Sequence, residues 1–403
     1  MLVWAVIEIE FVGSSFFSQD ATARAAIEAA ADHVGDAITS TLTPIDQVAF
    51  TDTAGNTTAT LDWAFAFLDP ITDEPIGNFP TAVTNPSLNA NTVRVFVDAQ
   101  PLDGNDVGIG VPAGAEADIG ASFIPPLNAA AIQGVANEAD AEMNRGGDGP
   151  LIGVLFEGND NLNGNIDVDP VRFRSSFGGI AFDIDTDDND LLDTDQQLLD
   201  FWHLDHTTAV EPTKIDLFSV AVSEILAGLG FGTSNSFEEL VSGLDWNGGE
   251  VADLIDSGEN VLDPFDPNNV RSGTLSNRLS DGAVQQAALD PDITAGVREE
   301  LTLLDLAFLR DIGWQTVDAV PGTPGDANGD GAVDLLDLDI LGANFGSTDA
   351  GVAQGDFNGD GNVDLLDLDI LGANFGNVSA VSVPEPATQV LVACVTLAAR
   401  FRS

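Results

Sequence analysis

Two acidic segments near the C-terminus have the residue types and spacing of calcium ligands. Residues 326–346 read DANGDGAVDLLDLDILGANFG, and residues 356–376 repeat them as DFNGDGNVDLLDLDILGANFG. Each copy offers side-chain oxygen at positions 1, 3, 5, 9 and 12, a carbonyl at position 7 and a turn-forming glycine at position 6, which is the order of a calcium loop. A solvated acidic turn needs neither this spacing nor its duplication. The predicted Ca²⁺ ligands are Asp326, Asn328, Asp330, Ala332, Asp334 and Asp337 in the first loop, and Asp356, Asn358, Asp360, Asn362, Asp364 and Asp367 in the second.

Leucines at helical spacing follow each loop and predict a short helix there. The carboxylates gathered in each loop repel one another without metal, so we expect two Ca²⁺ ions to fold the segment. Position 12 is Asp, where calmodulin-like loops have Glu, and the pair therefore resembles a type I dockerin rather than a calcium sensor. The resemblance implies a small α-helical dockerin with two EF-hand-like loops, residues 326–378, that binds a cohesin-like protein partner.

A second candidate site lies in residues 214–234, which read KIDLFSVAVSEILAGLGFGTS. Apolar residues recur at helical spacing until three glycines end the run, which predicts a buried helix. The phrase SEILAGLGFGTS resembles the active-site helix of matrixin-like zinc metalloproteases (metzincins), in which His residues bind zinc and a Glu acts as general base. The resemblance places Glu224 at the general-base position and the ligand positions on Ser223, Ala227 and Thr233. None of the three offers imidazole, so zinc is not expected and Glu224 is a residual, inactive catalytic position.

Two neighbouring segments extend this resemblance. Residues 287–314 are similar to the region around the Met-containing turn and the last helix of these enzymes, with Leu289 in place of the Met. Within it, Thr302 and Asp305 form a capping signature for a helix that ends at Gly313. Residues 201–206, FWHLDH, resemble the segment before the active-site helix. For the two His of that segment, His203 and His206, a hydrogen-bonding or surface role is favoured; metal binding stays open because no third ligand is visible.

The charge of the chain restricts its partners. The 66 acidic and 12 basic residues give a formal charge of −54, which argues against nucleic acid and anionic membrane surfaces and favours cations. The hydrophobic content of 44% argues against wholesale disorder. Two other acidic stretches, 157–169 and 183–195, are expected to be solvated surface, with a structural calcium site as the alternative.

The elements that must position the second candidate site are a mixture of strands and helices. Strands are predicted at 60–68, 93–98 and 178–184, and helices at 21–42, at 128–142 and within 214–234, whereas the glycine-rich segment 104–114 is expected to be a loop. In metzincin-like enzymes the edge strand that pairs with substrate comes shortly before the active-site helix. The resemblance therefore implies that strand 178–184 lies at the sheet edge, where an extended peptide would bind near Ile180 to Ile184. The predicted fold class is α+β, comprising a metzincin-like main domain of sheet and helices (1–317), a linker (318–325), the dockerin (326–378) and a hydrophobic tail (383–403).

The tail begins with Pro384-Glu385-Pro386, continues apolar through residues 387–399 and ends with two arginines. This order resembles a PEP-CTERM sorting signal. The apolar stretch is short beside the ~20 residues of a membrane span, so the resemblance implies transient membrane contact and a processed tail. The only cysteine, Cys394, excludes an intrachain disulfide. Export to the cell envelope, surface or extracellular matrix is expected, with a signal peptide upstream of Met1 missing from the sequence.

Three functions compete at this point. The first is an exported, surface-sorted, calcium-binding docking protein with a metalloprotease-like domain that has lost zinc and catalysis. The second is an active zinc endopeptidase with substitute ligands, and the third is a polysaccharide-degrading hydrolase carried by the dockerin. Because Ser, Ala and Thr do not replace imidazole, the sequence favours the first.

Overall fold

The computed structural model describes residues 4–46, 49–67, 83–102, 106–155, 168–187, 189, 191–252, 254–255, 260–264, 266–317, 325, 327, 333–347, 354–355, 357 and 363–376. These residues form helices and sheets in both halves of the chain, which confirms the α+β class. The chain divides into two compact units, Met1–Leu279 with Ala283–Ala319, and Ser280–Gly282 with Val320–Ser403.

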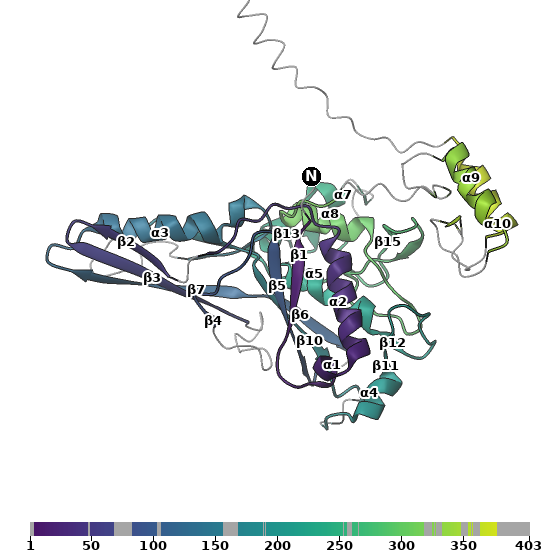
Figure 1. The fold of residues 1–403 in the computed structure, drawn as a ribbon, viewed down its shortest axis with the longest axis horizontal. Coiled ribbons are helices and arrows are strands. Elements are labelled where there is room, and N and C mark those ends of the chain that lie inside the picture. The colour runs from purple at the N-terminus through teal and green to yellow at the C-terminus, as the bar shows by residue number, and fades with distance from the viewer. Residues whose placement is uncertain are drawn as a thin grey trace, which may run out of the picture. The chain divides into compact units, whose positions relative to one another are not determined.

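The centre of the first unit is a four-stranded sheet of order β1-β5-β10-β6, formed by Val6–Phe11, Thr92–Gln100, Phe177–Asp183 and Gly108–Pro112 (Figure 1). Strands β1, β5 and β10 are parallel, and β6 runs antiparallel to β10. The expectation that strand 178–184 lies at the edge is wrong. Strand β10 pairs on both sides and is buried along its whole length, as expected of an apolar strand inside a sheet, and β6 is the terminal strand.

Helix α2 (Ala21–Gly35) packs against β1 and α5. Asp20 caps it by accepting hydrogen bonds from the amides of Thr22 and Ala23. The predicted helix to residue 42 is too long. Helix α2 ends at Gly35, and the residues after it form hydrogen bonds with other segments of the chain. There the Ala5 amide donates to the Ile38 carbonyl at 3.0 Å.

A second sheet and helix form a separate layer with its own aromatic core. Strands β2 (Phe50–Ala54), β3 (Thr57–Ala66), β4 (Val83–Thr84) and β7 (Gly114–Phe123) are antiparallel, and α3 (Ala129–Met143) lies along them (Figure 1). The alternation of buried and exposed residues along β3 confirms the prediction of a half-buried strand. Strands β8 (Leu151–Leu155) and β9 (Val171–Arg174) pair beside α3.

Shorter elements complete the unit around two longer helices, α5 (Leu217–Gly228) and α8 (Leu303–Ile312). The capping box predicted for α8 is confirmed, since Thr302 and Asp305 bond each other's backbone amides. The remaining elements are α1 (Phe16–Gln19), a 3₁₀ turn (Arg145–Gly147), α4 (Asp195–Phe201), β11 (Trp202–His203), β12 (Ile215–Asp216), α6 (Asn235–Leu240), β13 (Val241–Ser242), β14 (Asp245–Trp246), α7 (Gly249–Ala252), β15 (Leu275–Asn277) and β16 (Val284–Gln286).

In the second unit, two helices of identical sequence, α9 (Leu335–Asn344) and α10 (Leu365–Asn374), pack on each other. Their small core contains Val333, Leu341, Val363 and Leu371. The backbone repeats this symmetry, since the Gly346 amide donates to Val363 and the Gly376 amide donates to Val333, both at 2.8 Å. Within the described residues no helix is long and apolar enough to cross a membrane, and the predicted tail (383–403) lies outside them.

Candidate functional site

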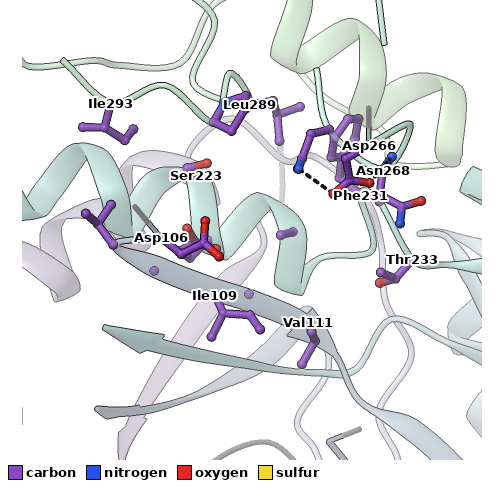
Figure 2. Close-up of a pocket in the computed structure, with 18 residues that line it drawn as sticks. Asp106, Ile109, Val111, Ser223, Phe231, Thr233, Asp266, Asn268, Leu289 and Ile293 are labelled. Carbon is purple, nitrogen blue, oxygen red and sulfur yellow. Dashed lines mark hydrogen bonds between the residues drawn. The ribbon is translucent and has the colours of Figure 1, made fainter. Parts of the chain in front are cut away.

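A cavity of about 230 Å³ lies beside α5 and β6, and the residues at the predicted degenerate zinc positions all line it. Glu224 and Ala227 line it from α5. Ser223 lines it from the same helix, and Thr233 lines it from the glycine-rich turn after the helix (Figure 2). Leu289, which stands where the resemblance expects Met, closes another side. The structure therefore brings together residues that the sequence spreads from 223 to 289.

Glycines in β6 allow α5 to approach the sheet. A Cβ atom on Gly108 would lie 2.7 Å from Oε1 of Glu224, and one on Gly110 would lie 2.1 Å from the backbone oxygen of the same residue. At Gly110 the neighbouring atoms belong to the backbone and cannot move aside, so only glycine fits there and helix and strand touch through their backbones. The prediction of a loop at 104–114 is wrong for residues 108–112, where the alternation of Val107, Ile109 and Val111 with small residues was the available signal for a strand.

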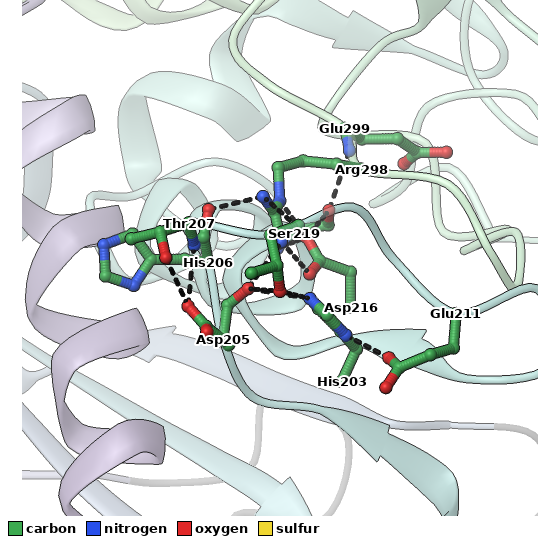
Figure 3. Close-up of polar contacts among 10 residues, drawn as sticks. His203, Asp205, His206, Thr207, Glu211, Asp216, Ser219, Arg298 and Glu299 are labelled. Atoms are coloured by element: carbon green, nitrogen blue, oxygen red, sulfur yellow. Dashed lines mark hydrogen bonds and ion pairs between the residues drawn. The ribbon is translucent and has the colours of Figure 1, made fainter. Parts of the chain in front are cut away.

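The start of α5 is fixed by a buried polar network. Asp216 is the N-cap, and its Oδ2 accepts hydrogen bonds from the Ser219 amide and from Ser219 Oγ, the latter at 2.7 Å. Arg298 donates to both Asp216 oxygens at 2.9 and 2.8 Å, and the Ser219 hydroxyl accepts from the Glu299 amide at 2.7 Å (Figure 3). These contacts connect α5 to the segment that carries Leu289.

The electrostatics of the cavity keep Glu224 protonated at neutral pH. Burial, with a smaller contribution from the nearby carboxylate of Asp106, raises the pKa of Glu224 to about 8. A general base must be ionised to accept a proton, so this carboxyl is an acid at neutral pH. None of the described residues that line the cavity is His, Lys or Arg.

Four further polar residues of the cavity were not identified from the sequence. Asp106 precedes β6, while Asp266 and Asn268 belong to a turn more than thirty residues beyond α5 (Figure 2). Asn269 lines the cavity from the same turn. Asp266 holds its own turn by accepting from the Asn268 amide and from Nδ2 of Asn269, each at 3.1 Å. No local spacing relates these residues to Glu224, so only the fold could place them there.

The two His of residues 201–206 lie in a different place and have structural contacts. Nδ1 of His203 faces Glu211, and Nε2 faces the Asp205 carbonyl at 2.7 Å, so this buried ring is fully hydrogen-bonded (Figure 3). His206 stacks on Phe218 with ring centroids 6.4 Å apart. In the described part of the chain no group of three or more His, Cys, Asp or Glu residues is arranged to hold a metal ion.

In the acidic stretch 183–195, the carboxylates of Asp183 and Asp193 accept hydrogen bonds from nearby residues. Asp183 accepts hydrogen bonds from the Leu102 and Asp185 amides, and Asp193 accepts from the amide and hydroxyl of Thr186. Most of the stretch 157–169 lies outside the described residues.

In the second unit, the last carboxylate of each predicted calcium loop closes that loop. Asp337 accepts from the Ala327 amide at 2.9 Å and the Asp334 amide at 2.8 Å, and Asp367 accepts from the Phe357 and Asp364 amides, both at 2.8 Å. Both side chains are buried although charged, which suits a role in binding a cation. The other predicted ligands lie outside the described residues: Asp326, Asn328, Asp330, Ala332, Asp356, Asn358, Asp360 and Asn362.

Comparison with protein families agrees with this geometry. The family described as Dockerin type I domain matches residues 324–375, so the chain carries a type I dockerin there. Neither the curated proteins nor the solved structures contain a match to the chain.

Proposed function

We propose that the chain is an exported docking protein in which a calcium-loaded dockerin attaches a zinc-free, metalloprotease-like unit to a cohesin-like partner. The observation that carries the proposal for the first unit is the cavity, where Ser223, Ala227 and Thr233 surround Glu224 beside a terminal strand. This arrangement supports the resemblance to a metzincin site. It also supports the loss of catalysis, because zinc needs three protein ligands and the cavity offers no imidazole.

The same unit is proposed to bind an extended polypeptide along β6, rather than near Ile180 as the sequence led us to expect. The Asp183 amide donates to the Val107 carbonyl, and the Ala113 amide donates to the Phe177 carbonyl. Because antiparallel ladders alternate, Gly108 and Gly110 turn their N–H and C=O groups away from β10. Such groups are the template for strand addition.

The dockerin is proposed to bind two Ca²⁺ ions through the twelve residues predicted from the repeat. Asp334, Asp337, Asp364 and Asp367 would contribute carboxylate oxygen beside the starts of α9 and α10. Calcium supplies the positive charge that lets these acidic loops close, and the loaded module then presents its surface to a cohesin-like protein. The sorting tail and the location at the cell surface are part of the same proposal, supported by the Pro-Glu-Pro and arginine pattern of residues 384–402.

Zinc analysis combined with restoration of the ligands tests the proposal for the first unit. The purified chain should contain no stoichiometric zinc and should not cleave casein, whereas Ser223→His, Ala227→His and Thr233→His together should acquire zinc. Stoichiometric zinc in the unmodified protein, with casein cleavage abolished by Glu224→Gln, would contradict it. Peptide binding is tested separately with a blocked heptapeptide and its alternately N-methylated analogue, which cannot add to a strand and should lose binding.

A further inference from the structure

We propose that the cavity beside β6 binds the basic side chain, Lys or Arg, of a polypeptide that lies along this strand. The inference rests on the proposed peptide binding and adds to it the chemical class of the ligand. In the metalloproteases that the sequence resembles, a metal cation would occupy this position. Here the geometry points to an organic cation carried by the peptide itself.

Charge is the first argument. Three carboxyl groups line the cavity, those of Asp106, Glu224 and Asp266, and no described lining residue is basic. Asp266 is engaged in its own turn through Asn268 and Asn269. The Glu224 carboxyl lines the cavity and has no hydrogen-bond partner among the described residues. A half-buried carboxyl in this situation gains most from a ligand that brings both hydrogen-bond donors and positive charge.

Two hydroxyl groups of the cavity can also accept hydrogen bonds from a ligand. Oγ1 of Thr233 is buried and has no hydrogen-bond partner among the described residues, and the Ser223 side chain faces the same space (Figure 2). An ammonium group has three donors and a guanidinium group has five, whereas neither accepts. The carboxyl and hydroxyl oxygens around the cavity can accept the hydrogen bonds that such a group donates.

Shape is the third argument. The walls between the polar groups are apolar, formed by Ile109, Phe231, Leu289 and Ile293. Long basic side chains bury an aliphatic stem and keep a charged end, so these walls suit the stem. A volume of about 230 Å³ is below the roughly 300–1,000 Å³ of pockets for drug-sized molecules, which fits a single side chain. A metal ion would need a set of at least three fixed ligands, and the described residues offer none.

Proton release gives the proposal a measurable signature. The charged neighbour that acts on Glu224 is Asp106, which precedes β6, and the other ionisable group among the described lining residues, Asp266, is also acidic. Because burial raises the pKa of Glu224 to about 8, the empty cavity holds a proton at neutral pH that a cationic side chain must displace. Below that pH, the affinity for the lysine side chain should therefore increase about tenfold for each unit by which the pH is raised, because Lys itself stays charged throughout.

The experiment compares two blocked heptapeptides of alternating Thr and Ala that differ only at the central residue, lysine or norleucine. Isothermal titration calorimetry with the full-length protein, at fixed ionic strength and at pH 6, 7 and 8.5, measures affinity and proton release. At pH 8.5 the lysine peptide should bind at least about tenfold more tightly than the norleucine peptide, as expected for hydrogen bonds to a charged group. A third peptide with arginine at the central position shows whether the cavity prefers a guanidinium or an ammonium group.

Variants identify the group responsible. Glu224→Gln should abolish the pH dependence and most of the preference for lysine, and Asp106→Asn should weaken that preference. Asp118→Asn removes one charge from exposed β7, away from the cavity, and should change affinity less than twofold, since a distant surface charge is screened. Circular dichroism checks that each variant folds. Equal, pH-independent binding of both peptides would overturn the inference but leave strand addition intact, whereas binding of neither would overturn both.

Discussion

The carbonyl oxygen of Glu224 is so close to Gly110 that a Cβ atom at that glycine would lie 2.1 Å away. Helix α5 and strand β6 therefore meet through backbone atoms, and this contact places the Glu224 side chain beside the outward-facing groups of the strand. The cavity and the terminal strand are consequently parts of one surface. We expect changes in that contact to affect stability and peptide binding together.

Gly110→Ala should destabilise the first unit by about 1–3 kcal/mol or more. The added methyl group would clash with backbone atoms of Glu224, which cannot rotate away as a side chain can. Gly249→Ala is the matched control, since nothing lies within 4 Å of the added atom, and it should stay within about 0.5 kcal/mol. Urea denaturation measures both free energies of unfolding. Equal stability of the two variants would show that α5 does not pack this closely on β6.

Glu299→Gln should stabilise the protein at alkaline pH. This side chain is 1% exposed, both of its oxygens lack hydrogen-bond partners among the described residues, and burial beside Asp290, Asp305 and Asp216 raises its pKa to about 8. A raised carboxyl pKa means that the folded state holds an extra proton between the ordinary value and 8, so stability falls with rising pH across that window, by about 1.4 kcal/mol per unit at most.

Denaturation curves at pH 5 and pH 8 check this expectation. The variant should differ little from the unmodified protein at pH 5 and should be the more stable of the two at pH 8. Glu116→Gln, an exposed substitution in β7, should shift neither curve. A stabilisation that is the same at both pH values would rule out ionisation of Glu299 as its cause.

Arg298→Met should lower the free energy of unfolding by about 3–5 kcal/mol, because it leaves the fully buried Asp216 carboxylate without its cation. Arg298 also donates to the His206 and Thr208 carbonyls, so the loop around His203 should become sensitive to proteolysis. Arg172→Met removes an ion pair with Asp140 whose Arg side chain is 50% exposed, and should cost no more than about 1 kcal/mol. Similar losses in the two variants would argue against a special role for the Asp216 pair.

Asp337→Asn should reduce the calcium stoichiometry of the dockerin from two to one. The amide oxygen can still accept from the Ala327 and Asp334 amides, so the substitution separates charge from hydrogen bonding. Calcium titration after chelation, followed by calorimetry and far-UV circular dichroism, should show two sites and a gain of helix in the unmodified chain. Unchanged circular dichroism on adding calcium would contradict metal-dependent folding of residues 326–376.

Processing of the tail should remove about the last 20 residues, the length scale of a membrane-engaging segment. Mass spectrometry of the protein recovered from the cell surface measures this directly. Substituting Pro384 and Pro386 by alanine should retain the full-length form if the Pro-Glu-Pro motif is the signal. An intact C-terminus on the unmodified surface form would rule out a sorting tail.

The sequence by itself determined those features whose residues are neighbours along the chain. The predicted calcium ligands of each loop lie within twelve consecutive residues, and the dockerin family match confirms the type of domain predicted from them. Thr302 and Asp305 likewise form the predicted capping box, because a cap depends on residues three apart. The helix that contains Glu224 was also predictable, since its apolar periodicity and terminal glycines are local signals.

The tertiary structure decided how distant segments meet. Strand β6 comes more than one hundred residues before Glu224, yet it becomes the terminal strand, and the residues just before it supply Asp106 to the cavity. The family resemblance placed the sheet edge at residues 178–184 instead, because that strand comes shortly before the helix of Glu224. Which strand edges stay unpaired is decided only when distant strands pair, and β10 is paired on both sides. The raised pKa of Glu224 follows from the same packing, since burial and the approach of Asp106 exist only in the folded chain.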